Sequence, residues 1–343
     1  MEQGLDQVAR DFHKAAPLVS DLGDGVRTSV GLVSAVMSLP HRILLIDEPE
    51  AFLHPTLARR VGKVLASTAR ERNASLIVAT HSSDFLMGCI QSAPDLRIVR
   101  LTYFKGQPTA RTVEPTEITS LMQNPLLRST NALRALFHRG VVISEADADR
   151  AFYEEINTRL LEDARGIEGG LFLNAQNWQT VPKIAFPLRK LGIPASAVLD
   201  FDVLRADSLG DLWNLITAQD KNPLQSKFGQ LKPIIQAIPK EDLKANGIAA
   251  IPDANRPAVQ SFLDSLAEHG VFIVPVGELE CWLNALGVDK TNNKPLWLIN
   301  MFQRLGDDPG AAAYVRAGAE DVWSFIEKIE QWIENPNRKG IPL

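Results

Sequence analysis

Short apolar runs alternate with amphipathic stretches along most of the chain, a pattern typical of parallel α/β layering. The first apolar run ends in an acidic residue, and the next run closes on Thr80-His81-Ser82. In this part of the chain the pattern predicts a strand at 42–47, a helix at 55–72, a strand at 75–79, and a hairpin of 96–102 and 110–113.

The same alternation returns in the second part of the chain. It follows a polar, proline-containing stretch at 114–124, which we interpret as a connector, and a short helix expected at 129–138. The elements expected next are strand 141–144, helix 147–163, strand 170–174, helix 178–191, strand 197–202, a mostly helical stretch 208–270, strand 271–276, and helices within 296–335.

The chain has 343 residues, a length that suits about two domains. The expected organisation is a first domain at 1–115, a connector at 116–137, a second domain at 138–290 with a helical insertion at about 205–270, and a helical region at 291–343.

Composition narrows the class of protein. A hydrophobic content of 45% and a charged content of 22% match a globular protein and exclude collagen-like and disordered chains. The apolar runs are shorter than a membrane span and the first residues lack a basic start, so we expect a cytoplasmic protein without a membrane partner. Cys89 and Cys281 lie far apart, which predicts two buried thiols rather than a disulfide or a zinc site.

Three sequence features point to a nucleotide site. The strand expected at 42–47 leads into an acidic pair, where the first carboxylate would hold Mg²⁺ and the second would orient the attacking water. Upstream, a glycine-rich turn opens a helix whose N–H groups would cradle a phosphate. Downstream, a histidine ends the next strand. Each feature alone also has a structural explanation, but their order and spacing favour the site. The residues concerned are Gly23, Asp24, Gly25, Asp47, Glu48 and His81.

The segments LGDGVRTSV, LLIDEPEAFLHP and VATHSSDFL resemble the signature, Walker B with D-loop, and switch-histidine motifs of ABC-type ATPases. The form EPEAFLHP is similar to the branch that contains recombination and OLD-family ATPases. The resemblance implies that 1–115 is the C-terminal half of an ABC-type ATPase domain. No GxxxxGK(S/T) motif occurs in the sequence. ATP is therefore expected as a cofactor only if a P-loop is supplied elsewhere, by a longer protein or a partner. The third alternative is that the ATPase half has decayed into a scaffold. This chain alone is not expected to hydrolyse ATP.

A second group of acids follows the strands expected in the second domain. Glu145 ends the first strand, and Asp149 lies four residues later on the same helix face. Asp200 and Asp202 are expected on one side of the third strand, because residues i and i+2 of a strand point together. Since the carboxyl ends of parallel strands gather at one edge, the four acids are expected to meet.

Crowded carboxylates repel one another unless cations lie between them. Acids that bridge two metal ions hold the attacking and leaving oxygens in phosphoryl-transfer enzymes. The group therefore predicts a site for Mg²⁺ or Mn²⁺. The alternative is that Glu145 and Asp149 only favour a helix dipole while Asp200 and Asp202 cap a loop.

Two further acids extend this group. The strand expected at 271–276 leads into Gly277, which permits a tight turn, and then into Glu278 and Glu280. These two side chains are expected at the same sheet edge, where they would complete a second metal position. The alternative is that they are first-turn acids of the following helix.

A glutamate after the first strand and Asp-x-Asp after the third resemble the Toprim domain of topoisomerases, primases and OLD-family nucleases. Ala146 stands where that pattern usually has glycine. The order of an ABC-type half followed by Toprim resembles the OLD family over residues 20–283, through FHRGVVISEADADRAFY, VLDFDVL and PVGELECWL. This resemblance implies an α/β fold in which a partial ABC-type ATPase sheet precedes a Toprim domain, a Rossmann-like parallel sheet with a helical insertion and a helical C-terminal tail.

The resemblance also implies a metal-dependent DNA endonuclease in phage defence or DNA repair. Its catalytic residues would be Glu145, Asp200 and Asp202. Its metal site would add Asp149 and an acidic pair matching Glu278 and Glu280. The expected partners are DNA and either further copies of the chain or a protein that supplies the P-loop half. Two alternatives remain: a non-catalytic DNA-sensing or assembly module that completes a partner's ATP site, and, less favoured, a Toprim phosphatase or primase-like enzyme.

Overall fold

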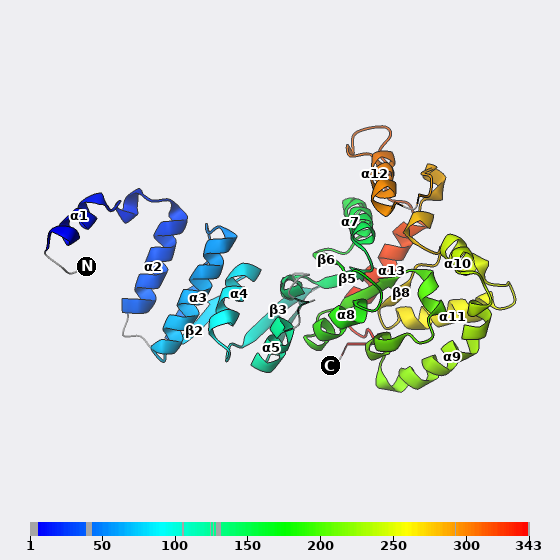
Figure 1. Ribbon diagram of the computed structural model, residues 1–343, viewed down its shortest axis with the longest axis horizontal. Helices are drawn as coiled ribbons and strands as arrows, with labels where there is room; N and C mark the ends of the chain where they lie inside the picture. The colour runs from blue at the N-terminus through cyan, green and yellow to red at the C-terminus, as the bar shows by residue number, and fades with distance from the viewer. Residues whose placement is uncertain are drawn as a thin grey trace. The chain divides into compact units, whose positions relative to one another are not determined.

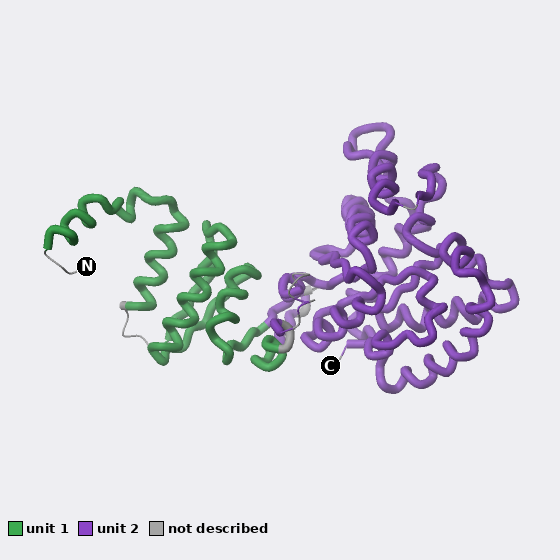
Figure 2. The backbone as a smooth tube through the Cα atoms, in the orientation of Figure 1, with its two compact units in different colours: residues 1–99, 112–120 green, residues 100–111, 121–343 purple. Residues whose placement is uncertain are grey.

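The computed structural model describes residues 6–38, 43–104, 106–123, 125, 127, 132–291 and 293–341. The chain divides into two compact units (Figure 2). Unit 1 comprises residues 1–99 and 112–120, and unit 2 comprises residues 100–111 and 121–343.

Unit 1 is built on two parallel strands, β1 (Ile43–Asp47) and β2 (Ser75–Ala79). Their helices are α1 (Gln7–Ala15), α2 (Asp24–Ser38), α3 (Pro55–Glu71) and α4 (Ser83–Ser92), and the last three lie side by side (Figure 1). The strand predicted at 42–47 is confirmed from Ile43, and the helix at 55–72 and the strand at 75–79 are confirmed. Residue 42 lies outside the described residues.

Local sequence signals set the ends of these helices. Pro55 opens α3, where its fixed φ suits the first helical position and its missing N–H costs nothing. The hydroxyl of Ser82 caps α4 by accepting a hydrogen bond from the backbone N–H of Phe85 at 3.2 Å. A Cβ placed on Gly88 of α4 would lie 2.0 Å from the carbonyl oxygen of Arg59 in α3. The two helices therefore pack backbone against backbone.

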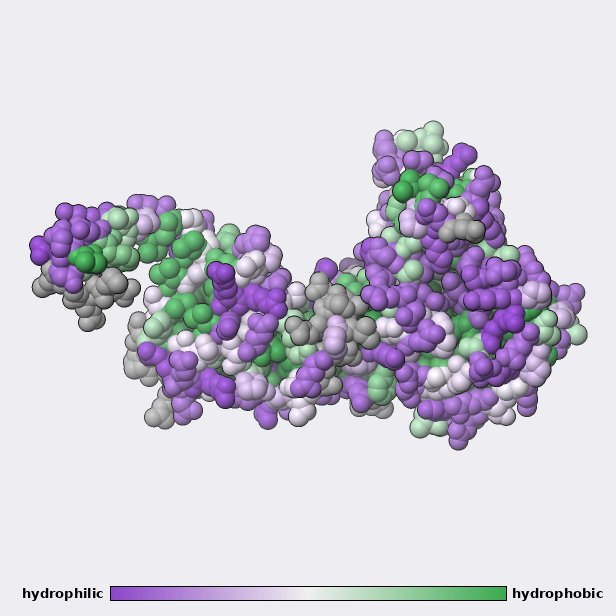
Figure 3. All heavy atoms as spheres, in the orientation of Figure 1, coloured by the Kyte–Doolittle hydropathy of each residue, from purple (hydrophilic) through white to green (hydrophobic). Residues whose placement is uncertain are grey.

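One face of the β1–β2 sheet is covered and the other is not. Leu44, Ile46 and Val78 pack against the core formed by α3 and α4. Ile43, Leu45 and Ile77 are 64%, 75% and 60% exposed on the opposite face. Helix α2 also carries exposed apolar side chains, which appear as green atoms over that helix in Figure 3. Unit 1 therefore presents apolar surface.

The chain continues through a two-stranded sheet of β3 (Ile98–Phe104) and β4 (Gln107–Val113). Strand β3 begins and ends two residues later than predicted, and β4 begins three residues earlier. The stretch predicted as a connector at 114–124 contains helix α5 (Pro115–Gln123). The side chain of Glu117 accepts a hydrogen bond from the N–H of Glu114 and so supports the first turn of this helix. Where a helix was predicted at 129–138, the described residues form the 3-10 helix η2 (Ala132–Phe137).

Unit 2 contains a four-stranded parallel sheet in the order β6-β5-β7-β8. The strands are β5 (Gly140–Ser144), β6 (Gly170–Asn174), β7 (Ala195–Leu199) and β8 (Val271–Ile273). The connecting helices are α7 (Asp147–Glu162), α8 (Val181–Lys190) and α11 (Arg256–Ala267). Every residue of β5, β7 and β8 is buried, as expected for a parallel sheet covered on both faces. The α/β class predicted from the sequence is confirmed.

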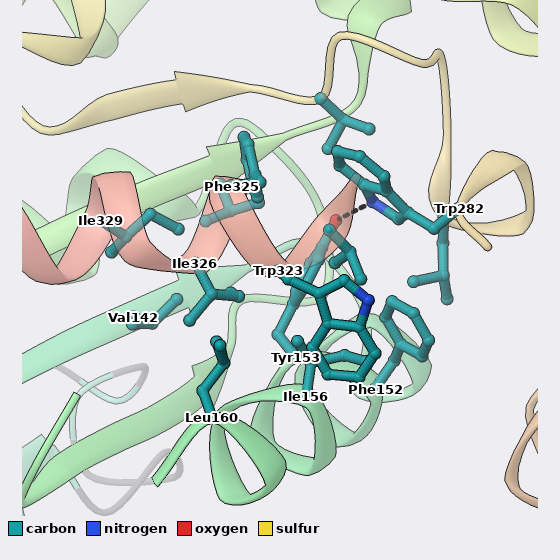
Figure 4. Close-up of a cluster of buried hydrophobic side chains, with 14 of the residues drawn as sticks. Val142, Phe152, Tyr153, Ile156, Leu160, Trp282, Trp323, Phe325, Ile326 and Ile329 are labelled. Atoms are coloured by element: carbon teal, nitrogen blue, oxygen red, sulfur yellow. Dashed lines mark hydrogen bonds between the residues drawn. The ribbon is translucent and has the colours of Figure 1, made fainter. Parts of the chain in front are cut away.

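The main core of unit 2 lies between this sheet, α7 and the C-terminal helix α13 (Val322–Glu334) (Figure 4). Val142 contributes from β5, Ile156 from α7, and Phe325 from α13. Within this core the indole N–H of Trp282 donates a hydrogen bond to the Tyr153 hydroxyl at 3.1 Å, drawn as a dashed line in Figure 4. This packing fixes α7 and the segment after β8 on the same side of the sheet.

Between β7 and β8 the chain is helical, as predicted for 208–270. The elements are η3 (Phe201–Arg205), η4 (Gly210–Leu215), α9 (Ala218–Gln236), α10 (Lys240–Asn246), η5 (Gly247–Ala250) and α11. After β8 come η6 (Leu279–Cys281), η7 (Asn284–Leu286), α12 (Lys294–Leu305) and α13. Helices were predicted within 296–335, but residues 306–321 form none.

Two strand predictions were wrong at their ends. The strand predicted at 197–202 is β7, which begins at Ala195 and stops at Leu199, because the N–H of Phe201 turns to the carbonyl of Gly277 at 2.8 Å. The strand predicted at 271–276 ends at Ile273, since Pro275 has no N–H for a sheet ladder and the N–H of Gly277 closes a turn on the carbonyl of Val274 at 3.2 Å. At both places the chain leaves the sheet before the apolar run in the sequence ends.

Candidate metal and nucleotide sites

The nucleotide-related residues of unit 1 follow its two parallel strands. Asp47 pairs in register with Ala79 at the ends of β1 and β2. The N–H of Glu48 donates to the carbonyl of Ala79 at 2.9 Å, and Glu48 has a φ of 43°. His81 Nδ1 lies 3.4 Å from Glu48 Oε1. The structure therefore brings Glu48 and His81 together, and Asp47, the last residue of β1, directly precedes Glu48.

Sequence reasoning missed Glu50, which joins the two loops. Its side chain is buried, and Oε1 accepts hydrogen bonds from the Thr80 hydroxyl at 2.6 Å and the His81 N–H at 3.2 Å. Its Oε2 is buried without a hydrogen-bond partner among the described residues. The sequence signal was the second glutamate of LLIDEPE. Only the acidic pair before it was considered as part of the nucleotide site.

The glycine-rich turn packs against the loop after β1. A Cβ on Gly25 would lie 2.7 Å from the carbonyl oxygen of Phe52, so a larger residue does not fit there. Gly23 has open space where its Cβ would lie. The Asp24 carboxylate, placed in the first turn of α2, pairs with Arg27 of the same helix. Of the two glycines in this turn, Gly25 has no room for a side chain and Gly23 does.

The acids of unit 2 gather at the carboxyl edge of its sheet, and we call the six of them the acidic edge: Glu145, Asp149, Asp200, Asp202, Glu278 and Glu280. Glu145 follows β5, and its Oε1 accepts a hydrogen bond from the backbone N–H of Asp200 at 2.9 Å. Asp149 Oδ2 accepts from the N–H of Ala146 at 2.9 Å, so this side chain also caps α7. For Asp149 the alternative role as a helix-start acid is therefore present as well.

Asp200 and Asp202 reach the acidic edge by a different geometry from the one predicted. Asp200 precedes the 3-10 helix η3 and Asp202 lies within it, so the two do not share one side of a strand. The charges of Asp149 and Glu145 still act on Asp200, because all three surround the ends of β5 and β7. The strand argument for Asp200 and Asp202 was therefore wrong, although Asp200 still contacts Glu145 through its backbone N–H.

Glu278 and Glu280 follow the turn at Gly277, which has a φ of 120°. The helix expected behind them is only the single 3-10 turn η6. Glu280 is 4% exposed, and its Oε2 has no hydrogen-bond partner among the described residues. A buried carboxylate oxygen without a donor is costly, which distinguishes Glu280 from an exposed helix-start acid.

Lysines from two helices form ion pairs with the acidic edge, and sequence reasoning missed them. Lys294, the first residue of α12, places Nζ 3.4 Å from Asp149 Oδ1 and 3.5 Å from Asp200 Oδ2. On α10, Lys240 Nζ lies 3.1 Å from Asp202 Oδ2, and Lys244 Nζ lies 3.2 Å from Glu278 Oε2. We call Lys240, Lys244 and Lys294 the lysine set. These residues stand far from the acids in sequence, so no spacing signals them.

The pKa values reflect burial and crowding. Burial, together with the charges of Asp149 and Asp202, raises the pKa of Glu145 to about 7. Burial raises the pKa of Asp200 well above its usual range despite the nearby ammonium of Lys294. Burial also raises the pKa of Glu280. Burial alone would lower the pKa of Lys294, but the carboxylates around it raise that pKa well above its ordinary value. The acidic edge therefore favours a bound positive charge.

The residues of the acidic edge share one kind of metal-binding atom. Their donors are all carboxylate oxygens, the ligands preferred by Mg²⁺ and Mn²⁺. Glu280 contributes an oxygen without a donor, and the Lys294 ammonium already stands as a cation between Asp149 and Asp200. As arranged with these lysines, the described residues contain no group of three or more metal-ligating side chains that converges on one point. A metal ion would therefore have to take the place of an ammonium group.

Comparisons with known proteins match one family and several ATP-binding proteins. Residues 12–88 match the family described as "AAA domain, putative AbiEii toxin, Type IV TA system". The chain is 32% identical over 68 residues to the lipoprotein-releasing system ATP-binding protein LolD 2 of Chlorobaculum tepidum, covering 20% of this chain and 27% of that protein. It is 37% identical over 70 residues to the phosphonates import ATP-binding protein PhnC 1 of Ruegeria sp., again covering 20% and 27%.

A third similar protein is the phosphonates import ATP-binding protein PhnC 2 of Synechococcus sp., at 32% identity over 91 residues, which covers 26% of this chain and 33% of that protein. The chain thus spans between a quarter and a third of the length of these relatives. Among the described residues, no helix has both the length and the apolar character needed to cross a membrane. The comparisons identify an ATPase-like domain of the AAA and ABC kind at residues 12–88.

Proposed function

We propose that the protein is a divalent-metal-dependent DNA endonuclease of the OLD-like kind, acting in phage defence or DNA repair, with unit 2 as its Toprim-like nuclease part. The observation that carries the proposal is the acidic edge. Carboxylates that follow three strands, β5, β7 and β8, gather at one end of a parallel sheet, and one of them, Glu280, is buried with an oxygen that no donor satisfies.

Several acids of the chain would bind the metal ions together. Asp200, Asp202 and Glu145 would hold Mg²⁺ or Mn²⁺, with support from Asp149 and the pair Glu278 and Glu280. The hydrogen bond from the Asp200 N–H fixes one oxygen of Glu145 and leaves the other for a ligand or a proton. Bound divalent ions would supply charge stabilisation to the attacking and leaving oxygens of a phosphodiester.

The ATPase-like segment supports an ATP-dependent role for the protein. Asp47, Glu48 and His81 are the residues that would face Mg²⁺ and the γ-phosphate. They lack a lysine loop in this sequence, so we propose that ATP is bound only together with a P-loop supplied by another part of the protein or by a partner. Partners in this proposal are DNA and either further copies of the chain or that P-loop protein.

Cleavage of supercoiled plasmid DNA tests the nuclease directly. The wild-type chain should nick the plasmid in Mg²⁺ or Mn²⁺ and not in EDTA, and Asp200→Asn should abolish nicking. Asp147→Asn is the matched control, because Asp147 lies in the first turn of α7 but pairs with Arg150 at 2.8 Å and is 72% exposed. Equal nicking by wild type and Asp200→Asn would contradict the proposal.

A second candidate function is a non-catalytic DNA-sensing or assembly module that completes a partner's ATP site. The exposed apolar face of the β1–β2 sheet, with Ile43, Leu45 and Ile77, favours a protein partner for unit 1. This candidate predicts no metal-dependent nicking and predicts an association that Leu45→Lys weakens. Light scattering after size-exclusion chromatography, run beside the plasmid assay, separates the two candidates.

A further inference from the structure

Each lysine of the lysine set forms ion pairs with different carboxylates of the acidic edge. Asp202 pairs with Lys240, Glu278 pairs with Lys244, and Lys294 lies between Asp149 and Asp200. Each ammonium therefore occupies a position next to a carboxylate that the proposed function assigns to a metal ion.

The backbone fixes where α10 presents its lysines. A Cβ on Gly277 would lie 2.1 Å from the carbonyl oxygen of Lys244, and a Cβ on Gly247 would lie 2.1 Å from that of Pro275. The N–H of Ile248 donates to the same Pro275 carbonyl at 2.8 Å. The end of α10 is thus pressed against the turn that carries Glu278, so Lys240 and Lys244 are held beside the acidic edge by main-chain contacts.

The side chains of these lysines are more exposed than the acids with which they pair. The side chains of Lys240, Lys244 and Lys294 are 57%, 30% and 31% exposed, whereas Asp149 and Asp200 are 5% and 15% exposed. A lysine carries its charge on a flexible four-carbon stem. The ammonium groups can therefore move outward from fixed Cα positions, while the buried carboxylates cannot.

The six carboxylates of the acidic edge outnumber the three ammonium groups of the lysine set. A divalent ion supplies twice the charge of one lysine and coordinates several oxygens at once, so it would compete with the lysines for the same carboxylates. Lysines displaced in this way would line the rim of the site as unpaired positive charges, which attract the phosphates of a nucleic acid.

We propose that the lysine set exchanges partners: it neutralises the acidic edge in the metal-free protein and contacts the DNA backbone once a divalent cation has taken the carboxylates. This inference rests on the proposed function. It names Lys240 and Lys244 of α10 as phosphate-contacting residues. It also makes metal binding and DNA binding mutually strengthening, because a coupling between two ligands is reciprocal.

Fluorescence anisotropy with a short labelled DNA duplex tests the exchange in Ca²⁺, which is expected to bind without supporting rapid cleavage. Wild type should bind DNA about tenfold more tightly in Ca²⁺ than in EDTA, and its slope of log K against log salt should steepen by about two. The variant Lys240→Ala with Lys244→Ala should lose both gains. Its matched control is Lys227→Ala with Lys232→Ala on α9, whose lysines bond Ser261 and Asp207 and not the acidic edge.

A second variant keeps the test decisive if the α10 variant is unstable. Lys294→Gln should bind Mn²⁺ about tenfold more tightly than wild type in isothermal titration without DNA, because its competing ammonium is gone. Metal binding by wild type with no gain in DNA affinity, or an α10 variant that keeps the gain, would overturn the exchange alone. Failure of both wild type and Lys294→Gln to bind Mn²⁺ would overturn the proposed function together with it.

Discussion

The Glu145 carboxylate accepts a hydrogen bond from the backbone N–H of Asp200 at 2.9 Å, although the two residues are 55 positions apart in the chain. This bond joins the ends of the neighbouring strands β5 and β7. It fixes one carboxylate oxygen and sets the distance between two acids proposed as metal ligands. The bond therefore ties the acid that follows β5 to the acid that follows β7.

Glu145→Gln should lower metal-dependent DNA cleavage by at least about a hundredfold, since a neutral amide loses the charge that holds a divalent ion. The amide oxygen can still accept the Asp200 N–H, so the thermal melting temperature should change little. Plasmid nicking and thermal melting measure the two effects on the same sample. Full nicking activity in this variant would remove Glu145 from the site.

Stability of the metal-free protein should depend on pH through Glu145. Burial raises its pKa from 4.5 to about 7, so between these pH values the folded protein binds more protons than the unfolded chain. The free energy of unfolding should therefore fall as pH rises from about 4.5 to 7, by an amount on the order of 2–3 kcal/mol. Urea unfolding in EDTA at several pH values measures this loss. Glu145→Gln should reduce it, and the raised pKa values of Asp200 and Glu280 should leave the remainder.

Glu50→Ala should destabilise unit 1 by about 1–3 kcal/mol, because it leaves the Thr80 hydroxyl and the His81 N–H without their acceptor. Glu50→Gln should cost less, since its amide oxygen keeps the acceptor. Local hydrogen exchange at residues 80–82 would report the difference. Exchange rates unchanged in Glu50→Ala would mean that water replaces the carboxylate without loss.

The sequence predicted α3, α7 and β5 to within one residue at each end, because the hydrophobic pattern of each is clear. It failed at the ends of β7 and β8, because apolar residues such as Phe201 and Val274 pack in the core after the chain has left the sheet. Hydropathy reports burial in both cases and does not distinguish a strand from a buried turn.

For the candidate site, the acids were predictable and their counter-ions were not. Glu145, Asp200 and Glu278 each follow an apolar run, which places them at one sheet edge by topology alone. Lys240 and Lys294 approach that edge from helices whose positions depend on tertiary packing, so no local pattern identifies them. Glu50 was missed for a similar reason, since its partners Thr80 and His81 come from the next strand.

The chain alone should show no appreciable ATP turnover, because Asp47 and Glu48 have no lysine loop beside them in this sequence. A phosphate-release assay with purified protein measures this directly. Nuclease activity should also survive Glu48→Gln if it depends on unit 2. Turnover at about 1 per second or faster that Glu48→Gln abolishes would contradict this account of unit 1.

Gly277→Ala should disturb the acidic edge without changing any carboxylate. Gly277 has a φ of 120°, and an added Cβ would lie 2.1 Å from the carbonyl oxygen of Lys244, a backbone atom that cannot swing away. The turn must therefore separate from α10, at a cost of more than about 2 kcal/mol. The same movement would pull Glu278 away from Lys244.

Gly229→Ala on α9 is the control, because its Cβ meets open space and alanine favours a helix. Urea unfolding should show a loss for Gly277→Ala and no loss for Gly229→Ala. Equal stability of both variants would mean that the turn after β8 is not held against α10.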